Sequence, residues 1–90
     1  LALDEIVSAI RIMSSEKVGS LIVIERKVGL REYIERGIEI DAKINNELIR
    51  TIFFENTPLH DGAIIISNNR ISSAGCYLPL SYSPDIKSTL

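Results

Sequence analysis

The sequence is poor in cysteine and has no long apolar run. Its single cysteine, Cys76, cannot form a disulfide within the chain, which suits a reducing compartment. The longest apolar stretches, residues 21–24 and 63–66, fall far below the roughly 20 residues that a membrane-spanning helix needs. We therefore expect no membrane helix within this chain, so that any membrane association comes through segments outside it.

An excess of basic charge is also absent. The chain carries 10 Lys and Arg residues against 12 Asp and Glu residues, for a net charge of -2, and the basic residues are scattered rather than clustered. A protein that binds polymeric nucleic acid needs a basic field to attract the phosphates. The sequence therefore predicts no polymeric nucleic acid as a partner.

What the sequence does contain is the composition of an ordinary globular protein. Its 90 residues are 46% apolar and 24% charged, which is typical of one soluble domain. A chain this short buries roughly 60–65% of the surface of its unfolded form, so the core is modest. The sequence starts at Leu1 rather than Met and shows no signal-peptide pattern, so we expect an excised piece, with residues 1–90 belonging to one domain.

Two segments have the apolar spacing of amphipathic helices. The spacing predicts a helix over residues 4–17, with the apolar positions Ile6, Val7, Ile10 and Met13. It predicts a second helix over residues 45–55, with the apolar positions Leu48, Ile49, Ile52 and Phe53. Asn45 or Asn46 is available as the N-cap of the second helix. Pro58 ends it, because proline has no N–H.

Short β-branched runs between these helices predict strands. Residues 20–25 read as a buried strand, and the alternation of Ile38, Ile40 and Ala42 predicts a half-buried one. Residues 30–34 are expected to form a helical turn. Residues 63–67 and 70–80 read as an antiparallel hairpin around Asn68-Asn69, with a bulge at Gly75. The order of elements predicts an α/β fold, a single domain with a mixed sheet flanked by helices.

The stretch NTPLHDGAIIIS, residues 56–67, places His60, Asp61 and Gly62 at the start of a buried strand. Asp-Gly is a common turn dipeptide, so a turn without chemistry is one interpretation. A carboxylate held on such a loop can also bind Mg²⁺ or Mn²⁺ and take a proton from a hydroxyl nucleophile. His60 is then either a metal ligand or an ordinary hydrogen-bonding residue.

The stretch GCYLPLSYS, residues 75–83, is a second candidate for the site. The ring of Tyr77 can stack on a purine, and Pro79 frees the backbone of Leu78 to read the edge of the base. The alternative is that Tyr77 and Leu78 simply cap the core at the end of a strand. If the hairpin forms, both motifs lie at one edge of the sheet and outline a nucleotide-sized site.

Together these motifs are specific. NTPLHDGAIIISNNRI followed by AGCYLPLS strongly resembles the catalytic domain of diadenylate cyclases. The segments VGSLIVIER, GLREYIERGIEIDAKI and ELIRTIFFENTPLHDGA continue the resemblance over essentially the whole chain. The pattern is most similar to the membrane-associated type found in Gram-positive bacteria. This resemblance identifies the chain as part of a diadenylate cyclase domain.

The resemblance implies an activity and a role for each candidate residue. These cyclases condense two ATP molecules into cyclic di-AMP and release two pyrophosphates, across a homodimer whose two domains meet face to face. By resemblance, Asp61 activates the ribose 3′-hydroxyl with a Mg or Mn divalent cation, and His60 lies at the metal site. The remaining residues would contact ATP: Gly62 and Ala63 at the ribose and phosphates, Tyr77 on the adenine ring, and the Leu78 backbone at its edge.

Parts of the family pattern do not occur in these residues. The Arg-His-Arg motif that grips the ATP phosphates and a later Ser-Glu segment are expected beyond Leu90. We therefore expect the 90-residue chain to have little or no activity alone. By the same resemblance, the full-length protein is expected to work at the cytoplasmic face of the cell membrane, anchored by other segments.

Two other interpretations stay open at this point. The chain could be a non-catalytic adenine-nucleotide-binding or dimerisation module that keeps the adenine pocket without the chemistry. It could also be an α/β scaffold in which Asp61-Gly62 is only a turn. Replacing Asp61 with asparagine separates the three interpretations. A cyclase loses turnover and keeps ATP binding, a pure binder has no turnover to lose, and in a scaffold neither nucleotide binding nor metal binding changes.

Overall fold

The computed structural model describes residues 2–79. Within them, four strands form one mixed sheet. The strands are β1 (Ile22–Ile24), β2 (Ile38–Lys43), β3 (Ala63–Ser67) and β4 (Arg70–Cys76), in the spatial order β1-β3-β4-β2. Strand β1 pairs with β3 in parallel, whereas β4 runs antiparallel to both β3 and β2.

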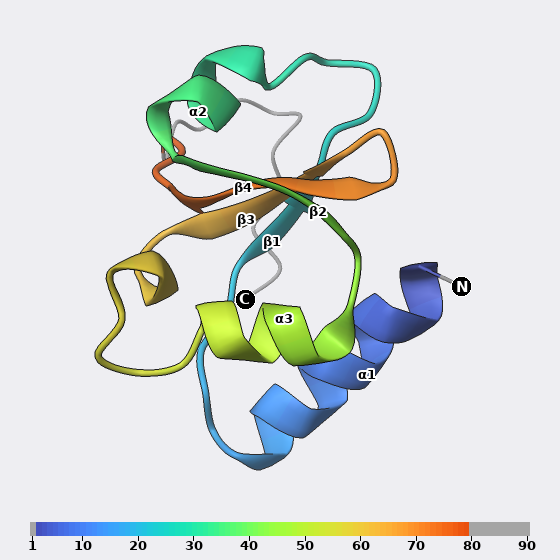
Figure 1. Cartoon of the computed structure of the whole chain (residues 1–90), viewed down its shortest axis with the longest axis vertical. Helices are drawn as coiled ribbons and strands as arrows, with labels where there is room; N and C mark the ends of the chain where they lie inside the picture. The colour runs from blue at the N-terminus through green and yellow to red at the C-terminus, as the bar shows by residue number, and fades with distance from the viewer. Residues whose placement is uncertain (1, 80–90) are drawn as a thin grey trace.

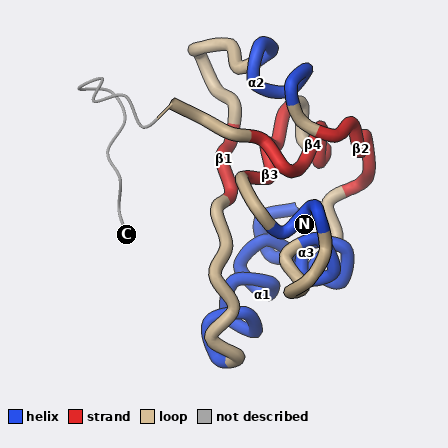
Figure 2. Tube along the Cα trace, turned by 90° about the vertical axis from the view of Figure 1, so that its left-hand side faces the viewer, coloured by secondary structure: helices blue, strands red, loops and turns tan. Residues whose placement is uncertain are grey.

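Helices cover both faces of this sheet (Figure 1 and Figure 2). Helices α1 (Ala2–Ser15) and α3 (Asn46–Ile52) lie on one face, and the short α2 (Arg31–Arg36) lies on the other. None of the helices in residues 2–79 reaches the length and hydrophobicity needed to cross a bilayer. The arrangement confirms the predicted α/β fold with a mixed sheet flanked by helices.

The apolar run of β3 lies at the centre of two hydrophobic clusters. Ile64 and Ile66 pack with residues of α1 and α3 on one face. Ala63 and Ile65 belong to a second cluster on the opposite face, against which residues of α2 pack. Because all five residues of β3 are buried, the expectation of a strand buried on both faces is confirmed.

Local sequence signals placed the helices well. The predicted helix over residues 4–17 is α1, and the predicted turn over residues 30–34 is α2. The side chain of Asn45 accepts a hydrogen bond from the Leu48 N–H at 3.1 Å, which confirms it as the N-cap of α3. Helix α3 ends earlier than predicted, with Phe53 as its C-cap, and the 3₁₀ helix η1 (Pro58–His60) was not predicted.

The strand predicted over residues 20–25 forms as β1, but the prediction that it is buried was wrong, because Ile22 and Val23 are only partly buried. Strand β1 spans three residues at the edge of the sheet, and Leu21 and Ile24 are 46% and 50% exposed. A continuous apolar run has no periodicity that separates an edge strand from a central one. The run therefore indicated a strand without indicating its place in the sheet.

The alternation expected for β2 is confirmed at Ile40 and Ala42, which are partly buried between exposed neighbours, but it is wrong for Ile38. Ile38 is 57% exposed, although the pattern placed it inward with Ile40. The pairing with β4 shifts register between Glu39 and Ala42, and Asp41 adopts a positive φ of 48°. Ile38 precedes this shift, and Ile40 and Ala42 keep the two-residue period across it.

The hairpin between β3 and β4 forms as predicted. Asn68 and Asn69 have φ values of 52° and 63°, the conformation of a two-residue turn with both central residues at positive φ. Gly75 has a φ of 62°, and the register shifts beside it, between the Ala63 and Ile65 pairs, so the bulge is confirmed. Strand β4 ends at Cys76, short of the predicted residue 80.

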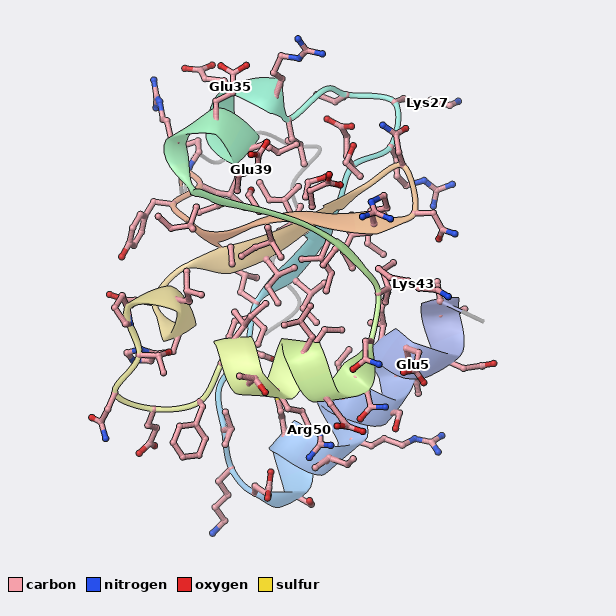
Figure 3. All side chains as sticks on the ribbon, viewed as in Figure 1. Glu5, Lys27, Glu35, Glu39, Lys43 and Arg50 are labelled. Carbon is pink, nitrogen blue, oxygen red and sulfur yellow. The ribbon has the colours of Figure 1, made fainter. Side chains whose placement is uncertain are left out.

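Helix α1 holds the start of α3 through Glu5 (Figure 3). Its Oε1 accepts hydrogen bonds from the backbone N–H of Asn46 at 3.0 Å and from the Asn46 amide Nδ2 at 3.1 Å. The backbone bond, followed by the side-chain bond, lowers the pKa of Glu5. The carboxylate therefore acts as a second cap on α3, supplied from a distant part of the chain.

We expect Glu5→Gln to lower the free energy of unfolding at neutral pH. Because the pKa of Glu5 is lowered in the folded state, its charge contributes stability above its unfolded-state pKa, and this is lost as the pH falls through the folded-state value. The difference between wild type and variant should thus shrink below about pH 4. Urea unfolding at pH 7 and pH 3 measures it, with the exposed Glu16→Gln as control. An equal difference at both pH values would contradict the capping role.

Candidate active site

The two candidate motifs meet at one edge of the sheet. Strands β1 and β3 begin there and the antiparallel β4 ends there (Figure 1). The last pair of the β3–β4 ladder joins Ala63 to Cys76. Asp61 and Gly62 therefore precede this pair on one chain segment, and Tyr77 follows it on the other. The hairpin brings the motifs together as predicted.

A side-chain hydrogen bond connects the motifs directly. The Tyr77 hydroxyl donates to Oδ2 of Asp61 at 3.2 Å. The negative charge of Asp61, with smaller effects of desolvation and of the hydrogen bond itself, raises the pKa of Tyr77. Tyr77 therefore stays a neutral donor at neutral pH. Within residues 2–79, the Asp61 carboxylate receives no other hydrogen bond.

Gly62 allows the two segments to approach this closely. Its φ is +96°, and an added Cβ would lie 2.9 Å from the Cys76 carbonyl oxygen and 3.0 Å from the Gly75 carbonyl carbon. A side chain at this position would push the segments apart and also strain the backbone. The sequence suggested that Gly62 lets a ligand approach, whereas the structure gives it a role in packing the site itself.

His60 lies at the end of η1, with its ring fixed by the preceding turn. Its Nδ1 hydrogen-bonds to the Thr57 carbonyl oxygen, and its backbone N–H donates to the same oxygen at 3.3 Å. A carbonyl oxygen can only accept, so Nδ1 carries a proton, and in the neutral imidazole Nε2 keeps its lone pair. His60 is also exposed, so Nε2 is available to a metal or a ligand.

The residues fit a divalent cation only if a nucleotide completes its coordination. Residues 2–79 contain no group of three or more His, Cys, Asp or Glu side chains that could hold a metal ion. Asp61 offers the hard carboxylate oxygen that Mg²⁺ and Mn²⁺ prefer, and His60 offers a nitrogen. Mg²⁺ is commonly bound by one or two carboxylates together with substrate phosphates. The site therefore suits a cation that arrives with ATP.

Three predicted ATP contacts differ in exposure. Tyr77 is 65% exposed, so the interpretation that it caps the core is wrong for its ring. The side chain of Leu78 packs against the second cluster, as that interpretation proposed. Ala63 is fully buried in the same cluster. Any contact of Leu78 or Ala63 with a nucleotide would therefore come through the backbone.

Two further features of this edge were missed in the sequence. Gly37 lies against the end of β4, where an added Cβ would be 2.7 Å from the Ala74 carbonyl oxygen. An open hollow of about 440 Å³ borders His60, and its lining includes Glu55 and Asn56. The positive φ of Asn56, 68°, follows the end of α3. In a sequence, the only signal for a close backbone approach or a positive φ of this kind is a Gly or Asn next to the end of a strand or helix.

Comparisons with known proteins show which family this chain belongs to. The profile of the family described as DisA bacterial checkpoint controller nucleotide-binding, DAC, matches residues 7–90. The cyclic di-AMP synthase CdaA of Bacillus subtilis is 50% identical over 88 residues, which are 98% of this chain and 32% of that protein. A diadenylate cyclase of Listeria monocytogenes is 46% identical over the same shares. The chain thus spans about a third of the length of these relatives.

Solved structures extend the similarity to three dimensions. A crystal structure of a double mutant of DacA from Staphylococcus aureus superposes with a TM-score of 0.87 at 44% identity, covering 99% of this chain and 59% of that one. A structure described as a hypothetical membrane spanning protein from Bacillus cereus gives a TM-score of 0.83 at 38% identity, covering 99% and 44%. With the profile match over most of its length, the chain belongs to the DisA bacterial checkpoint controller nucleotide-binding (DAC) family.

Proposed function

We propose that the protein carrying this sequence is a diadenylate cyclase, which condenses two ATP molecules into cyclic di-AMP and releases two pyrophosphates. The observation that supports this most is the position of Asp61 and Tyr77, side by side at one edge of the sheet. The names of the Bacillus and Listeria relatives describe the same activity in those proteins. A nucleotidyl transfer needs a residue that holds the adenine and a carboxylate that takes the proton. Tyr77 and Asp61 would fill these two roles.

The segment that follows β4 provides the adenine subsite in this proposal. The Tyr77 ring is available for stacking on the base, which contributes about 1–3 kcal/mol in comparable aromatic contacts. Strand β4 ends at Cys76, so the backbone groups of Leu78 lie outside the β3–β4 ladder and can pair with the edge of the adenine. Leu78 is itself held by packing on the second cluster, which fixes the position of that backbone.

Asp61 would take the proton from the ribose 3′-hydroxyl as that oxygen attacks the α-phosphate of the second ATP. The new bond joins the 3′-oxygen to the α-phosphorus, and the bond to the bridging oxygen breaks to release pyrophosphate. A Mg or Mn divalent cation, when bound, neutralises phosphate charge and lowers the cost of removing the proton. Asp61 and His60 are the side chains that would hold it, and the Gly62 and Ala63 backbone would face the ribose and phosphates.

The reaction needs two nucleotides, and one sheet edge presents one Asp61-Tyr77 pair. We therefore propose that two copies of the domain meet face to face as a homodimer, each holding one ATP. We also propose that other segments of the full-length protein anchor it at the cytoplasmic face of the membrane. The description of the Bacillus cereus protein as membrane spanning is consistent with this placement.

Incubation of the full-length protein with ATP and Mn²⁺ tests the proposal, with cyclic di-AMP and pyrophosphate measured by mass spectrometry. We expect one cyclic di-AMP for every two pyrophosphates. The 90-residue chain, assayed in parallel, should form little or none, because the phosphate-gripping Arg-His-Arg motif does not occur in it. ATP binding without product from the full-length protein would favour the non-catalytic binding module instead.

A further inference from the structure

The Tyr77 side chain offers two separate surfaces to the site. Its ring is largely exposed, and its hydroxyl donates to Oδ2 of Asp61. Adenine stacking uses the ring face alone, so it gives no reason for the hydroxyl. Phenylalanine would serve equally well for that purpose. The hydroxyl and its hydrogen bond therefore need a separate explanation.

We propose that the Tyr77 hydroxyl is a positioning group for Asp61: it fixes the carboxylate through Oδ2 and leaves Oδ1 for the cation and the ribose hydroxyl. This role rests on the diadenylate cyclase function proposed above. Within residues 2–79, no other group restrains the carboxylate, because its only hydrogen bond comes from Tyr77. Without that bond, the exposed side chain of Asp61 would be free to rotate.

The backbone behind Asp61 and Tyr77 fixes the geometry of the hydrogen bond between them. Ala63 and Cys76 form the last pair of the ladder, and both are buried in the second cluster. Gly62 then packs against the backbone of Gly75 and Cys76. Asp61 and Tyr77 thus project from two segments that are held together directly behind them. Such a rigid base lets one hydroxyl determine where the carboxylate lies.

The arrangement joins recognition of the base to the chemistry. The Tyr77 ring would stack on the adenine while its hydroxyl hydrogen-bonds to the Asp61 carboxylate. One side chain therefore fixes the distance between the adenine and the carboxylate. Ligating carboxylates are commonly held by a hydrogen bond of this kind, and losing the outer partner typically costs about 10- to 100-fold in metal affinity or activity. The expected loss therefore falls on the metal and on turnover, while ATP affinity is preserved.

The test compares Tyr77→Phe with wild type in the full-length protein. Tyr33→Phe is the matched control, since Tyr33 lies on α2 and the hydrogen bond to the Asp61 carboxylate comes from Tyr77 instead. Mn²⁺ binding is measured by electron paramagnetic resonance with 3′-deoxy-ATP, which lacks the attacking hydroxyl, and kcat and KM are measured with ATP. For Tyr77→Phe we expect Mn²⁺ affinity and kcat to fall about 10- to 100-fold, with KM for ATP unchanged when it is measured at saturating Mn²⁺. Tyr33→Phe should match wild type.

Several results would overturn the positioning role. Wild-type Mn²⁺ affinity and kcat in Tyr77→Phe would show that the hydrogen bond is incidental. A raised KM with unchanged Mn²⁺ affinity would assign the hydroxyl to the nucleotide instead. In an Asp61→Asn background, Tyr77→Phe should cause no further loss of Mn²⁺ binding, because the hydroxyl acts through the carboxylate, and an additive loss would contradict this.

The same experiment separates this inference from the proposed function. If the wild-type protein forms cyclic di-AMP and Tyr77→Phe behaves identically, only the positioning role fails. If the wild-type protein forms no product while Tyr77→Phe still weakens Mn²⁺ binding, the proposed activity fails and the positioning of Asp61 stands. The Mn²⁺ measurement does not depend on turnover. It therefore tests the positioning role of Tyr77, whereas product formation by the wild-type protein tests the proposed activity.

Discussion

Replacing Asp61 with asparagine in the full-length protein is expected to lower the rate of cyclic di-AMP formation by at least about 100-fold, the lower range of what a positioned general base contributes. Asparagine has nearly the same shape and can still accept the hydrogen bond from the Tyr77 hydroxyl. It cannot take a proton from the ribose or offer a charged oxygen to a cation. The local structure should therefore persist while the chemistry is lost.

ATP affinity separates this result from general damage to the site. Stacking on Tyr77 and contacts of the Leu78 backbone do not use the Asp61 charge, so binding of ATP without metal should be unchanged. Asp41→Asn is a suitable control, because Asp41 is exposed at the opposite edge of the sheet, where it pairs with Arg70 at 2.8 Å. Equilibrium binding and steady-state turnover of the three proteins provide the comparison.

The other interpretations predict different patterns. A non-catalytic binding module would bind ATP in both wild type and Asp61→Asn and would show no turnover in either. A scaffold whose Asp61-Gly62 is only a turn would show neither nucleotide binding nor metal binding to lose. Turnover that survives in Asp61→Asn at the wild-type rate would remove Asp61 from the mechanism and leave Tyr77 as the main remaining site residue.

Features determined by neighbouring residues could be predicted from the sequence. The Asn45 cap depends on one side chain and a backbone group three residues away, and the Asn68-Asn69 turn depends on the tolerance of asparagine for positive φ. The hairpin then implied that Asp61 and Tyr77 would lie close together. That part of the site followed from local chemistry and the antiparallel register.

Features that depend on distant parts of the chain could not be predicted in the same way. The edge position of β1 and the register shift beside Asp41 arise from strand pairing, which apolar periodicity does not encode. The approach of Gly62 to Cys76 needs the exact path of two segments. The hydrogen bond between Tyr77 and Asp61 follows from that approach. The sequence therefore indicated both residues as site candidates but did not predict the hydrogen bond between them.

Gly62→Ala is expected to have the largest effect on stability. A non-glycine residue in this backbone conformation costs on the order of 1–3 kcal/mol. The Cβ would also lie 2.9 Å from the Cys76 carbonyl oxygen, where the neighbour is backbone and cannot rotate away. The two segments must therefore separate, which moves Asp61 away from the Tyr77 hydroxyl. We expect a lower free energy of unfolding together with reduced turnover.

Gly29→Ala is the matched control, because a Cβ at Gly29 meets nothing within 4 Å and its backbone has no positive φ in the left-handed region. This substitution should leave the free energy of unfolding within about 0.5 kcal/mol of wild type, as is usual for surface changes. Urea unfolding at constant pH measures both variants. If Gly62→Ala were as stable as Gly29→Ala and still turned over ATP normally, the close approach of the Gly62 backbone to Cys76 would not be what brings Asp61 to Tyr77.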